Sequence, residues 1–333
     1  MSRRATLVRL WVALSALVAL TFAASMLVGS AWVSPADMWS ALRGDAASTV
    51  FRVVWELRLP RSLLGLLVGA SLGLSGAALQ GLLHNPLMEP GVGGVSAGAS
   101  LAAVVALYAG LSPLVVPLSG MFGALAAVWL VEAIAGRTGT AQSVLLAGLV
   151  ITTGCTALIA LALNLSPNPL ASLEIVFWLL GSLTDRSMEH VGWVVAPMAL
   201  GWALLLSCGR ALRAWTLGEE TAHSLGISRR SLRLRVMVGS ALSVGAAVSV
   251  SGSIGFVGLF VPHLMRPWVQ SDPGRLLPAS ALGGALLLSW ADLAVRLGAR
   301  LTHGAELKLG VMTALLGTPP LLVFALRTRR ALA

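Results

Sequence analysis

Apolar residues come in long runs, separated by short polar stretches, along the whole chain. A membrane-spanning helix needs about 20 mostly apolar residues, with about 17 as the lower limit. By this measure the pattern predicts ten membrane segments and a short additional helix near Glu174–Gly181. The ten segments are Leu10–Val28, Leu59–Leu83, Ser96–Leu118, Ser119–Ala135, Ser143–Leu165, His190–Ser207, Leu234–Ser251, Ile254–Leu264, Leu277–Val295 and Leu309–Leu326.

Two stretches interrupt this pattern. Ile254–Leu264 is too short to span a bilayer at about 1.5 Å per residue, so it is predicted to be a half-helix covered by other parts of the protein. The stretch from His84 to Ser100 contains two prolines and several glycines, which oppose continuous helix. It is predicted to be irregular and to act as a hinge or gate.

The composition fits a membrane protein and excludes a soluble one. Hydrophobic residues make up 57% of the chain and charged residues 11%, against about 25% charged residues in soluble proteins. The first apolar run follows Arg3, Arg4 and Arg9, and no soluble domain follows it, so we expect a retained helix and not a removed signal peptide. Residues 1–333 are predicted to form one polytopic all-α transmembrane domain.

The basic residues indicate the orientation. An even number of segments puts both termini on one side, and the side richer in arginine is cytoplasmic. With both termini inside, the inner stretches hold fifteen basic residues and the outer ones eight, which predicts cytoplasmic termini. The inner ones are Arg3, Arg4, Arg9, Arg137, Arg210, Arg213, Arg229, Arg230, Arg233, Arg235, Arg266, Arg275, Arg327, Arg329 and Arg330; the outer ones are Arg43, Arg52, Arg58, Arg61, Arg186, Arg296, Arg300 and Lys308. Because these residues lie between apolar runs, the net charge of +10 does not indicate nucleic-acid binding.

Several chemistries are excluded by what the sequence lacks. Lys308 is the single lysine, and it is followed by Leu309, so the chain has no G-x-x-x-x-G-K-[ST] phosphate-binding loop. No H-E-x-x-H motif and no convincing Ser-His-Asp arrangement occurs, so no catalytic residue and no metal site is predicted. Cys155 and Cys208 lie in or at the end of apolar runs and are expected to be small buried side chains. His263 is expected to be structural, since no other ligand type lies near it in the sequence.

The longest hydrophilic stretch, residues 209–235, is predicted to contain a short helix outside the membrane. Thr216 precedes two acidic residues as a helix-start signal, and Gly226 supplies a stop. Ala222 and Leu225 are expected on one face of this helix. A solvated linker is the alternative interpretation.

Two other functional classes are alternatives, a coupled carrier and a channel or structural membrane protein. A proton- or sodium-coupled carrier usually has ionisable residues deep in its spans, whereas Glu132, Asp292 and Glu306 fall near segment ends. Asp292 and Arg296 are four residues apart and are predicted to pair on a helix. A channel or structural membrane protein is the other alternative, and the interrupted stretches favour a protein that moves.

Five motifs, in order, resemble the permease subunits of type II ABC importers for iron chelates, haem and cobalamin, the FecCD type. They are RLPR at 58–61, SGAALQGLLHNPLMEPGVGGVSAGAS at 75–100, LGEETAHSLGIS at 217–228, GSIGFVGLFVPHLMR at 252–266 and ADLAVR at 291–296. The resemblance covers essentially the whole chain. It implies ten transmembrane helices per subunit and a dimer with the translocation pathway at the two-fold axis.

The resemblance also implies partners and residue roles. The partners would be a second copy of the chain, two ABC ATPase subunits that bind ATP and Mg, and a periplasmic binding protein at a bacterial inner membrane; no cofactor is expected on this chain. A coupling helix in 209–235 would dock into the ATPase through Leu217, Gly218, Glu219, Glu220, Ala222, Leu225 and Gly226. Arg58, Arg61 and Arg296 resemble arginines that pair with acidic residues of the binding protein. Asn85, Pro86 and Leu87 match the inner gate (the first gate segment), and Thr140 and Ala141 a second gate loop (the second gate segment).

The chain departs from the family pattern near its end. Lys308 stands where the family has proline in Glu-Leu-Pro-x-Gly, and Pro320 stands where it has phenylalanine in Gly-x-Pro-Phe. Neither change touches the coupling helix, so ATPase coupling is still expected. The substrate stays open, with an iron siderophore the commonest case in the family, haem next and cobalamin third.

Overall fold

The structure is a computed structural model, and it describes residues 3–29, 34, 39, 43, 49–112, 114–136, 139–166, 168–301 and 305–332. All regular secondary structure in these residues is helical. The helices are α1 (Arg3–Leu27), α3 (Thr49–Arg52), the π-helical η1 (Val53–Arg58), α4 (Leu59–Leu83), α5 (Val95–Tyr108), α6 (Val115–Ala135), α7 (Ala141–Asn164), α8 (Pro169–Leu179), α9 (Met188–Ser207), α10 (Gly209–Trp215), α11 (Glu219–Ser224), α12 (Arg229–Ser251), α13 (Val257–Met265), α14 (Pro273–Leu301) and α15 (Leu309–Leu332).

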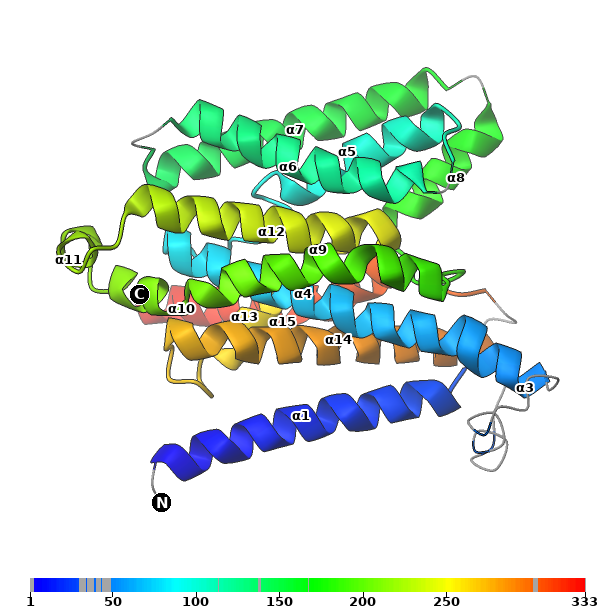
Figure 1. Cartoon of the computed structure of the whole chain (residues 1–333), viewed down its shortest axis with the longest axis horizontal. Coiled ribbons are helices and arrows are strands. Elements are labelled where there is room, and N and C mark those ends of the chain that lie inside the picture. Colours follow the sequence, from blue (N-terminus) through cyan, green and yellow to red (C-terminus); the bar gives the residue numbers. More distant parts are fainter. Residues whose placement is uncertain are drawn as a thin grey trace.

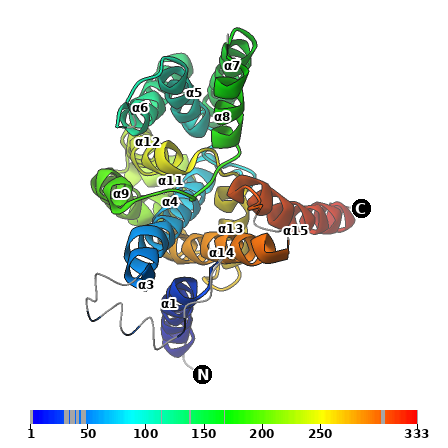
Figure 2. The same cartoon turned by 90° about the vertical axis from the view of Figure 1, so that its right-hand side faces the viewer.

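The long helices lie side by side as a bundle around α4 (Figures 1 and 2). One edge is formed by α5, α6 and α7; α12 lies between this edge and α4, and α9 packs against both α12 and α4. On the other side α4 packs against α14, and α1 contacts α14 at the opposite edge. The apolar window of α4 is 83% buried and that of α1 only 17%, so α4 forms the core whereas α1 presents most of its surface outward.

A helix lies at each of the ten predicted segments and near the additional one. Among the described residues, seven helices are long and apolar enough to cross a membrane, while α5, α8 and the described apolar part of α15 are shorter. The nine-residue α13 confirms the predicted half-helix. An all-helical membrane fold is therefore confirmed, and ten crossings per subunit stays a prediction.

Close approach of backbones explains many of the small residues. A Cβ atom added to Gly73 of α4 would overlap the carbonyl oxygen of Ser280 in α14, and one added to Gly76 would overlap that of Gly258 in α13. A Cβ atom at Gly201 of α9 would lie 2.7 Å from a carbonyl oxygen of α12. Small residues allow such contact between helices in lipid, where no hydrophobic effect drives helices together.

Two predicted boundaries are wrong. The segment Ser96–Leu118 is not one helix, because α5 ends at Tyr108 and α6 begins at Val115, with Gly110 at φ +63° between them. The irregular stretch predicted for 84–100 ends at Gly94, whose φ of +84° precedes the first turn of α5. Hydropathy did not reveal the break between α5 and α6 because the residues around it are apolar.

The half-helix α13 is attached to α4 by a buried glutamine. Gln80 donates hydrogen bonds to the carbonyl oxygens of Gly258 (3.3 Å) and Leu259 (3.2 Å), and its Oε1 accepts one from Arg266 (2.8 Å). One side chain thus satisfies backbone groups in the first turn of α13 and holds the arginine that follows its last turn. This arrangement gives the short helix polar partners inside the bundle, where the bilayer supplies no water.

Candidate functional site

The compact helix α11 lies at one end of the bundle, together with the two chain ends marked N and C (Figure 1). Gly218 (φ +101°) precedes its first residue and Gly226 (φ +80°) follows its last turn, so the predicted glycine stop is confirmed. The predicted start at Thr216 is wrong. Thr216 lies two residues before the cap position of α11, and its hydroxyl donates to the carbonyl oxygen of Arg213 in α10 instead.

The side chains of this helix divide into one buried residue and an exposed surface. Ala222 is fully buried, whereas Leu217 and Leu225 are 66% and 62% exposed. The prediction that Ala222 and Leu225 share a face is therefore wrong, because Leu225 follows the last helical turn and points outward. Glu219 forms an ion pair with Arg229 at the start of α12, while Glu220 is exposed.

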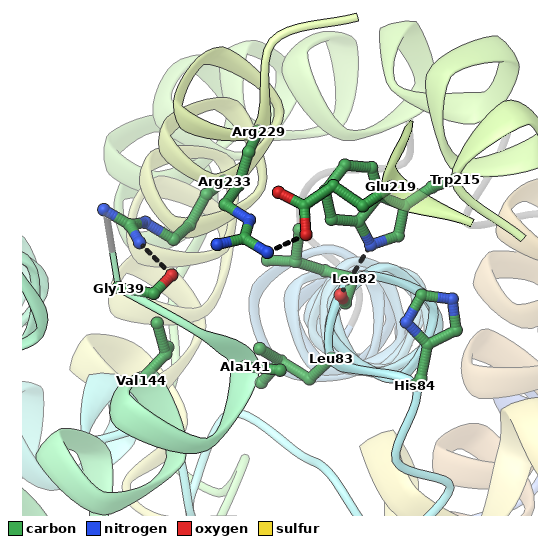
Figure 3. A pocket seen from close by; sticks show the side chains of 10 residues that line it. All are labelled: Leu82, Leu83, His84, Gly139, Ala141, Val144, Trp215, Glu219, Arg229 and Arg233. Carbon is green, nitrogen blue, oxygen red and sulfur yellow. Dashed lines mark hydrogen bonds and ion pairs between the residues drawn. The ribbon is translucent and has the colours of Figure 1, made fainter. Parts of the chain in front are cut away.

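A cavity of about 300 Å³ separates α11 from the helices that carry the two gate segments (Figure 3). Its lining comes from the end of α4, the turn before α7 and the start of α7, the last residue of α10, and α11 and α12. The lining residues are Leu82, Leu83, His84, Gly139, Ala141, Val144, Trp215, Glu219, Arg229 and Arg233. The structure thus brings together two stretches that lie more than 50 residues apart in the sequence, each beside one gate segment.

The first gate segment is a tight turn after α4. The Asn85 side chain accepts a hydrogen bond from the backbone N–H of Leu87 (2.9 Å), and the backbone carbonyl of Asn85 accepts one from Met88 (3.2 Å). Leu87 is 57% exposed, and Pro86 is half-buried. The turn therefore presents an apolar side chain on a stiff backbone.

The second gate segment begins α7. The Thr140 hydroxyl accepts a hydrogen bond from the backbone N–H of Ser143 (3.2 Å) as the N-cap, and Ala141 is the first helical residue. Thr140 is exposed. Whether either segment closes a pathway stays a prediction.

At the opposite end of the bundle, the three predicted docking arginines point inward. Arg296 pairs with Asp292 (2.6 Å), which confirms the predicted pair four residues apart. Arg61 pairs with the same carboxylate (2.8 Å) and with Glu306 (2.9 Å). Arg58 donates hydrogen bonds to the carbonyl oxygens of Met26 and Leu27 at the end of α1.

This network ties four helical segments together. Arg58 and Arg296 are 5% and 3% exposed, and the Arg61 side chain 12%. Arg296 also donates to the carbonyl oxygen of Ser25 (3.0 Å). The arginines thus place positive charge at the carbonyl end of α1, where the helix dipole favours it. Contact with a binding protein stays a prediction.

Sequence reasoning missed one carboxylate inside the bundle. Glu89 lies in the irregular stretch after α4 and accepts a hydrogen bond from the backbone N–H of Phe256 (3.2 Å), next to the first turn of α13. A Cβ atom added to Gly258 would lie 3.6 Å from the Cβ atom of Glu89 and 3.0 Å from the carbonyl oxygen of Leu72 in the middle of α4. The prediction placed Glu132, Asp292 and Glu306 near segment ends and did not consider Glu89. An acidic residue followed by Pro-Gly within the irregular stretch was the available signal.

No group of three or more His, Cys, Asp or Glu side chains that could hold a metal ion occurs in the part of the chain that the structure describes. Both cysteines are free; Cys208 is buried and Cys155 partly so.

The comparisons with known proteins agree with this arrangement. A model of the FecCD transport family matches residues 17–327. The chain belongs to the FecCD transport family. It is 42% identical over 299 residues to the vitamin B12 import system permease protein BtuC of Vibrio cholerae, covering 88% of this chain and 86% of that protein. It is 34% identical to BtuC of Citrobacter koseri, covering 95% and 94%.

A solved structure of a metal-chelate type ABC transporter in an inward-facing conformation has the same fold. It superposes with a TM-score of 0.83 at 31% identity and covers 96% of this chain and 99% of that one. The protein is thus a multi-pass permease subunit of a FecCD-type ABC transporter. It is a transport component and not an enzyme.

Proposed function

We propose that the chain forms a homodimeric permease that imports cobalamin, or a metal chelate of similar size, by ATP-driven alternating access. The observation that carries the proposal is the compact, exposed helix α11. It lies beside the cavity, at the end of the bundle that also carries both termini (Figure 1). The substrate would pass along the dimer axis and leave through the two gate segments.

In this proposal α11 docks into an ABC ATPase that binds ATP and Mg, since this chain has no phosphate-binding loop. Leu217 and Leu225 offer exposed apolar contacts on either side of the helix. Gly218 and Gly226 allow the two turns that make it project, and Glu219 and Glu220 supply negative charge for basic residues of the ATPase.

The orientation follows from this docking. An ATPase is cytoplasmic, so the end of the bundle that carries α11 and both termini would be cytoplasmic. The excess of arginine in the inner stretches supports the same orientation. A bacterial inner membrane and a periplasmic binding protein on the other side complete the arrangement.

At the outer end, Arg61 is the most accessible of the three predicted docking arginines. Its guanidinium already joins Asp292 and Glu306, so acidic residues of a binding protein would compete with these two carboxylates. We expect Arg58 and Arg296 to act through the network that positions Arg61. Charge complementarity of this kind sets association rate and specificity more than affinity.

The substrate class is proposed from the relatives. The family resemblance left the substrate open, with an iron siderophore as the commonest case, whereas the BtuC relatives by name import vitamin B12. Cobalamin is therefore the first substrate to test, with a ferric siderophore and haem as the alternatives.

The test is uptake into proteoliposomes that contain this permease with the ATPase and binding protein of the same transport system. We expect ATP-dependent uptake of one of the three substrates. Replacing Glu219 and Glu220 by alanine should abolish stimulation of the ATPase, whereas Glu189→Ala, an exposed glutamate in the first turn of α9, should leave it unchanged. Uptake that needs no nucleotide would refute the proposal, and so would an assembled complex that transports none of the three.

A further inference from the structure

Two side chains flank α11 in the sequence, and each holds the backbone beside one gate segment (Figure 3). Trp215 is the last residue of α10, four residues before α11 begins, and Arg233 lies in the first turns of α12. Both are buried, with exposed fractions of 6% and 3%.

Trp215 is bonded to the end of α4. Its indole N–H donates to the carbonyl oxygen of Leu82 (3.1 Å), and its ring stacks on His84 with 6.5 Å between the centroids. The carbonyl of Leu82 belongs to the last turn of α4, where carbonyls lack a partner within the helix. His84 caps the helix at φ +48°, and Asn85 of the first gate segment follows directly. Movement of the indole therefore moves the start of that segment.

Arg233 is bonded to the turn before α7. Its guanidinium donates to the carbonyl oxygens of Gly136 and Gly139, both at 2.8 Å, and pairs with Glu132 at 2.8 Å. Gly139 directly precedes Thr140 of the second gate segment. Hydrogen bonds that involve a charged group are about twice as strong as neutral ones, and here burial excludes competing water.

The cavity between these two contacts provides room for displacement. About 300 Å³ separates α11 from the ends of α4 and the start of α7, whereas a fully packed interior would resist such motion. The ion pair from Glu219 to Arg229 joins α11 to the same helix that carries Arg233, so a displacement of α11 acts on α12 directly.

We propose that Trp215 and Arg233 are positioning residues that transmit movement of α11 to the first and the second gate segment, respectively. The inference rests on the proposed function and deepens it, because it assigns each gate a separate mechanical connection to the coupling helix. Each connection has one defined contact point on backbone carbonyls. The two gates should therefore be separable by substitution.

The experiment uses the complete complex in proteoliposomes and measures substrate transported per ATP hydrolysed. Trp215→Phe keeps the ring over His84 and removes only the N–H donor. We expect the ratio to fall at least about threefold, as the loss of one buried hydrogen bond implies, while nucleotide hydrolysis continues. The matched control is Trp202→Phe, because the Trp202 indole N–H also donates to α4, to the hydroxyl of Ser71 (2.9 Å), far from either gate segment. The ratio of this variant should not change.

For the second connection, Arg233→Lys keeps the charge beside Glu132 but cannot reach both glycine carbonyls. We expect the same fall in the transport ratio. Glu132→Gln keeps the contacts to the carbonyls and should lower thermal stability while preserving the ratio. Arg213→Lys, which alters an arginine paired with Asp272 away from the gate segments, is the control.

A second measurement distinguishes transmission from general weakening. Single cysteines at Leu87 or Thr140, in a chain without Cys155 and Cys208, report gate opening through their labelling rate with and without ATP. Trp215→Phe should remove the ATP-dependent change at position 87 only, and Arg233→Lys at position 140 only. The inference would be overturned if either variant lost the ATP-dependent change in labelling at both positions, or kept it at both positions.

The reference complex separates this inference from the proposed function. Absence of ATP-dependent labelling and transport in the unsubstituted complex contradicts the proposed function itself. Normal behaviour there, combined with unaltered variants, overturns only the roles of Trp215 and Arg233. If Trp215→Phe does not assemble, His84→Ala removes the stacking partner and must give the same result at position 87.

Discussion

The contact between α9 and α12 allows a quantitative test of backbone packing. A Cβ atom at Gly201 would lie 2.7 Å from the carbonyl oxygen of Gly239 and 2.8 Å from the backbone nitrogen of Ser243. Real Cβ atoms essentially never come closer than 3.0 Å, and ordinary contact begins at 3.4 Å. Gly201→Ala therefore has to separate the helices by about 0.3 to 0.7 Å, since backbone atoms cannot rotate away.

Such a separation weakens the whole contact. A gap of about 0.5 to 1 Å forfeits a quarter to a half of the dispersion energy between facing atoms, and overpacking in a well-packed core typically costs about 1–3 kcal/mol. Gly192→Ala is the matched control in the same helix, because nothing lies within 4 Å of its added Cβ atom. Both variants gain about 1 kcal/mol of helix propensity, so their difference reports the packing cost alone.

The assay is thermal unfolding of the detergent-purified permease, followed with a thiol-reactive dye that reaches the buried Cys208 on unfolding. For a chain of this length 1 kcal/mol corresponds to about 1.5 °C, so Gly201→Ala should melt at least about 1.5 °C below Gly192→Ala. Equal melting temperatures, or a higher one for Gly201→Ala, would refute the claim that the two backbones are in contact.

Two further predictions concern buried polar contacts. Asp292→Asn leaves two buried arginines without the carboxylate they share, so it should cost about 3–5 kcal/mol of stability, measured as a lower melting temperature. The control is Glu56→Gln, which changes an exposed acidic residue at the same end and should stay within about 0.5 kcal/mol of the unsubstituted protein. Equal effects of the two variants would contradict the network. Gln80→Leu removes the donor to two carbonyls of α13 and should speed hydrogen–deuterium exchange across α13 more than across α4; unchanged exchange in α13 would mean that Gln80 does not hold it.

The membrane segments could be predicted because their signal is local. Runs of apolar residues place the helices, and the short run before Leu264 identified the half-helix α13. The break between Tyr108 and Val115 was missed, since a hydropathy average cannot distinguish an apolar turn from an apolar helix. The start of α11 was placed too early because Gly218, with φ +101°, takes the cap position that Thr216 was expected to occupy.

The site was predictable only in its local parts. The pair of Asp292 and Arg296 follows from helix periodicity, and the glycine stop at Gly226 follows from backbone conformation. The partners of Arg61 and Arg233 could not be derived, because Arg61 meets Glu306 across 245 residues and Arg233 meets Glu132 across 101. Nothing in a single sequence specifies which buried charges meet at that separation.

The position of α1 has a consequence for how the chain is made. This helix is synthesised long before its main partner α14, which begins at Pro273. At about 5–20 residues per second, roughly 250 residues of further synthesis take on the order of 10 to 50 s. During that time α1 has only η1 and α4 as partners in the bilayer, which its largely outward-facing apolar surface permits. Its contact with α14, through Arg296 at its carbonyl end, is therefore one of the last events of assembly, and a nascent chain truncated before α14 should leave the side of α1 that faces α14 accessible to lipid.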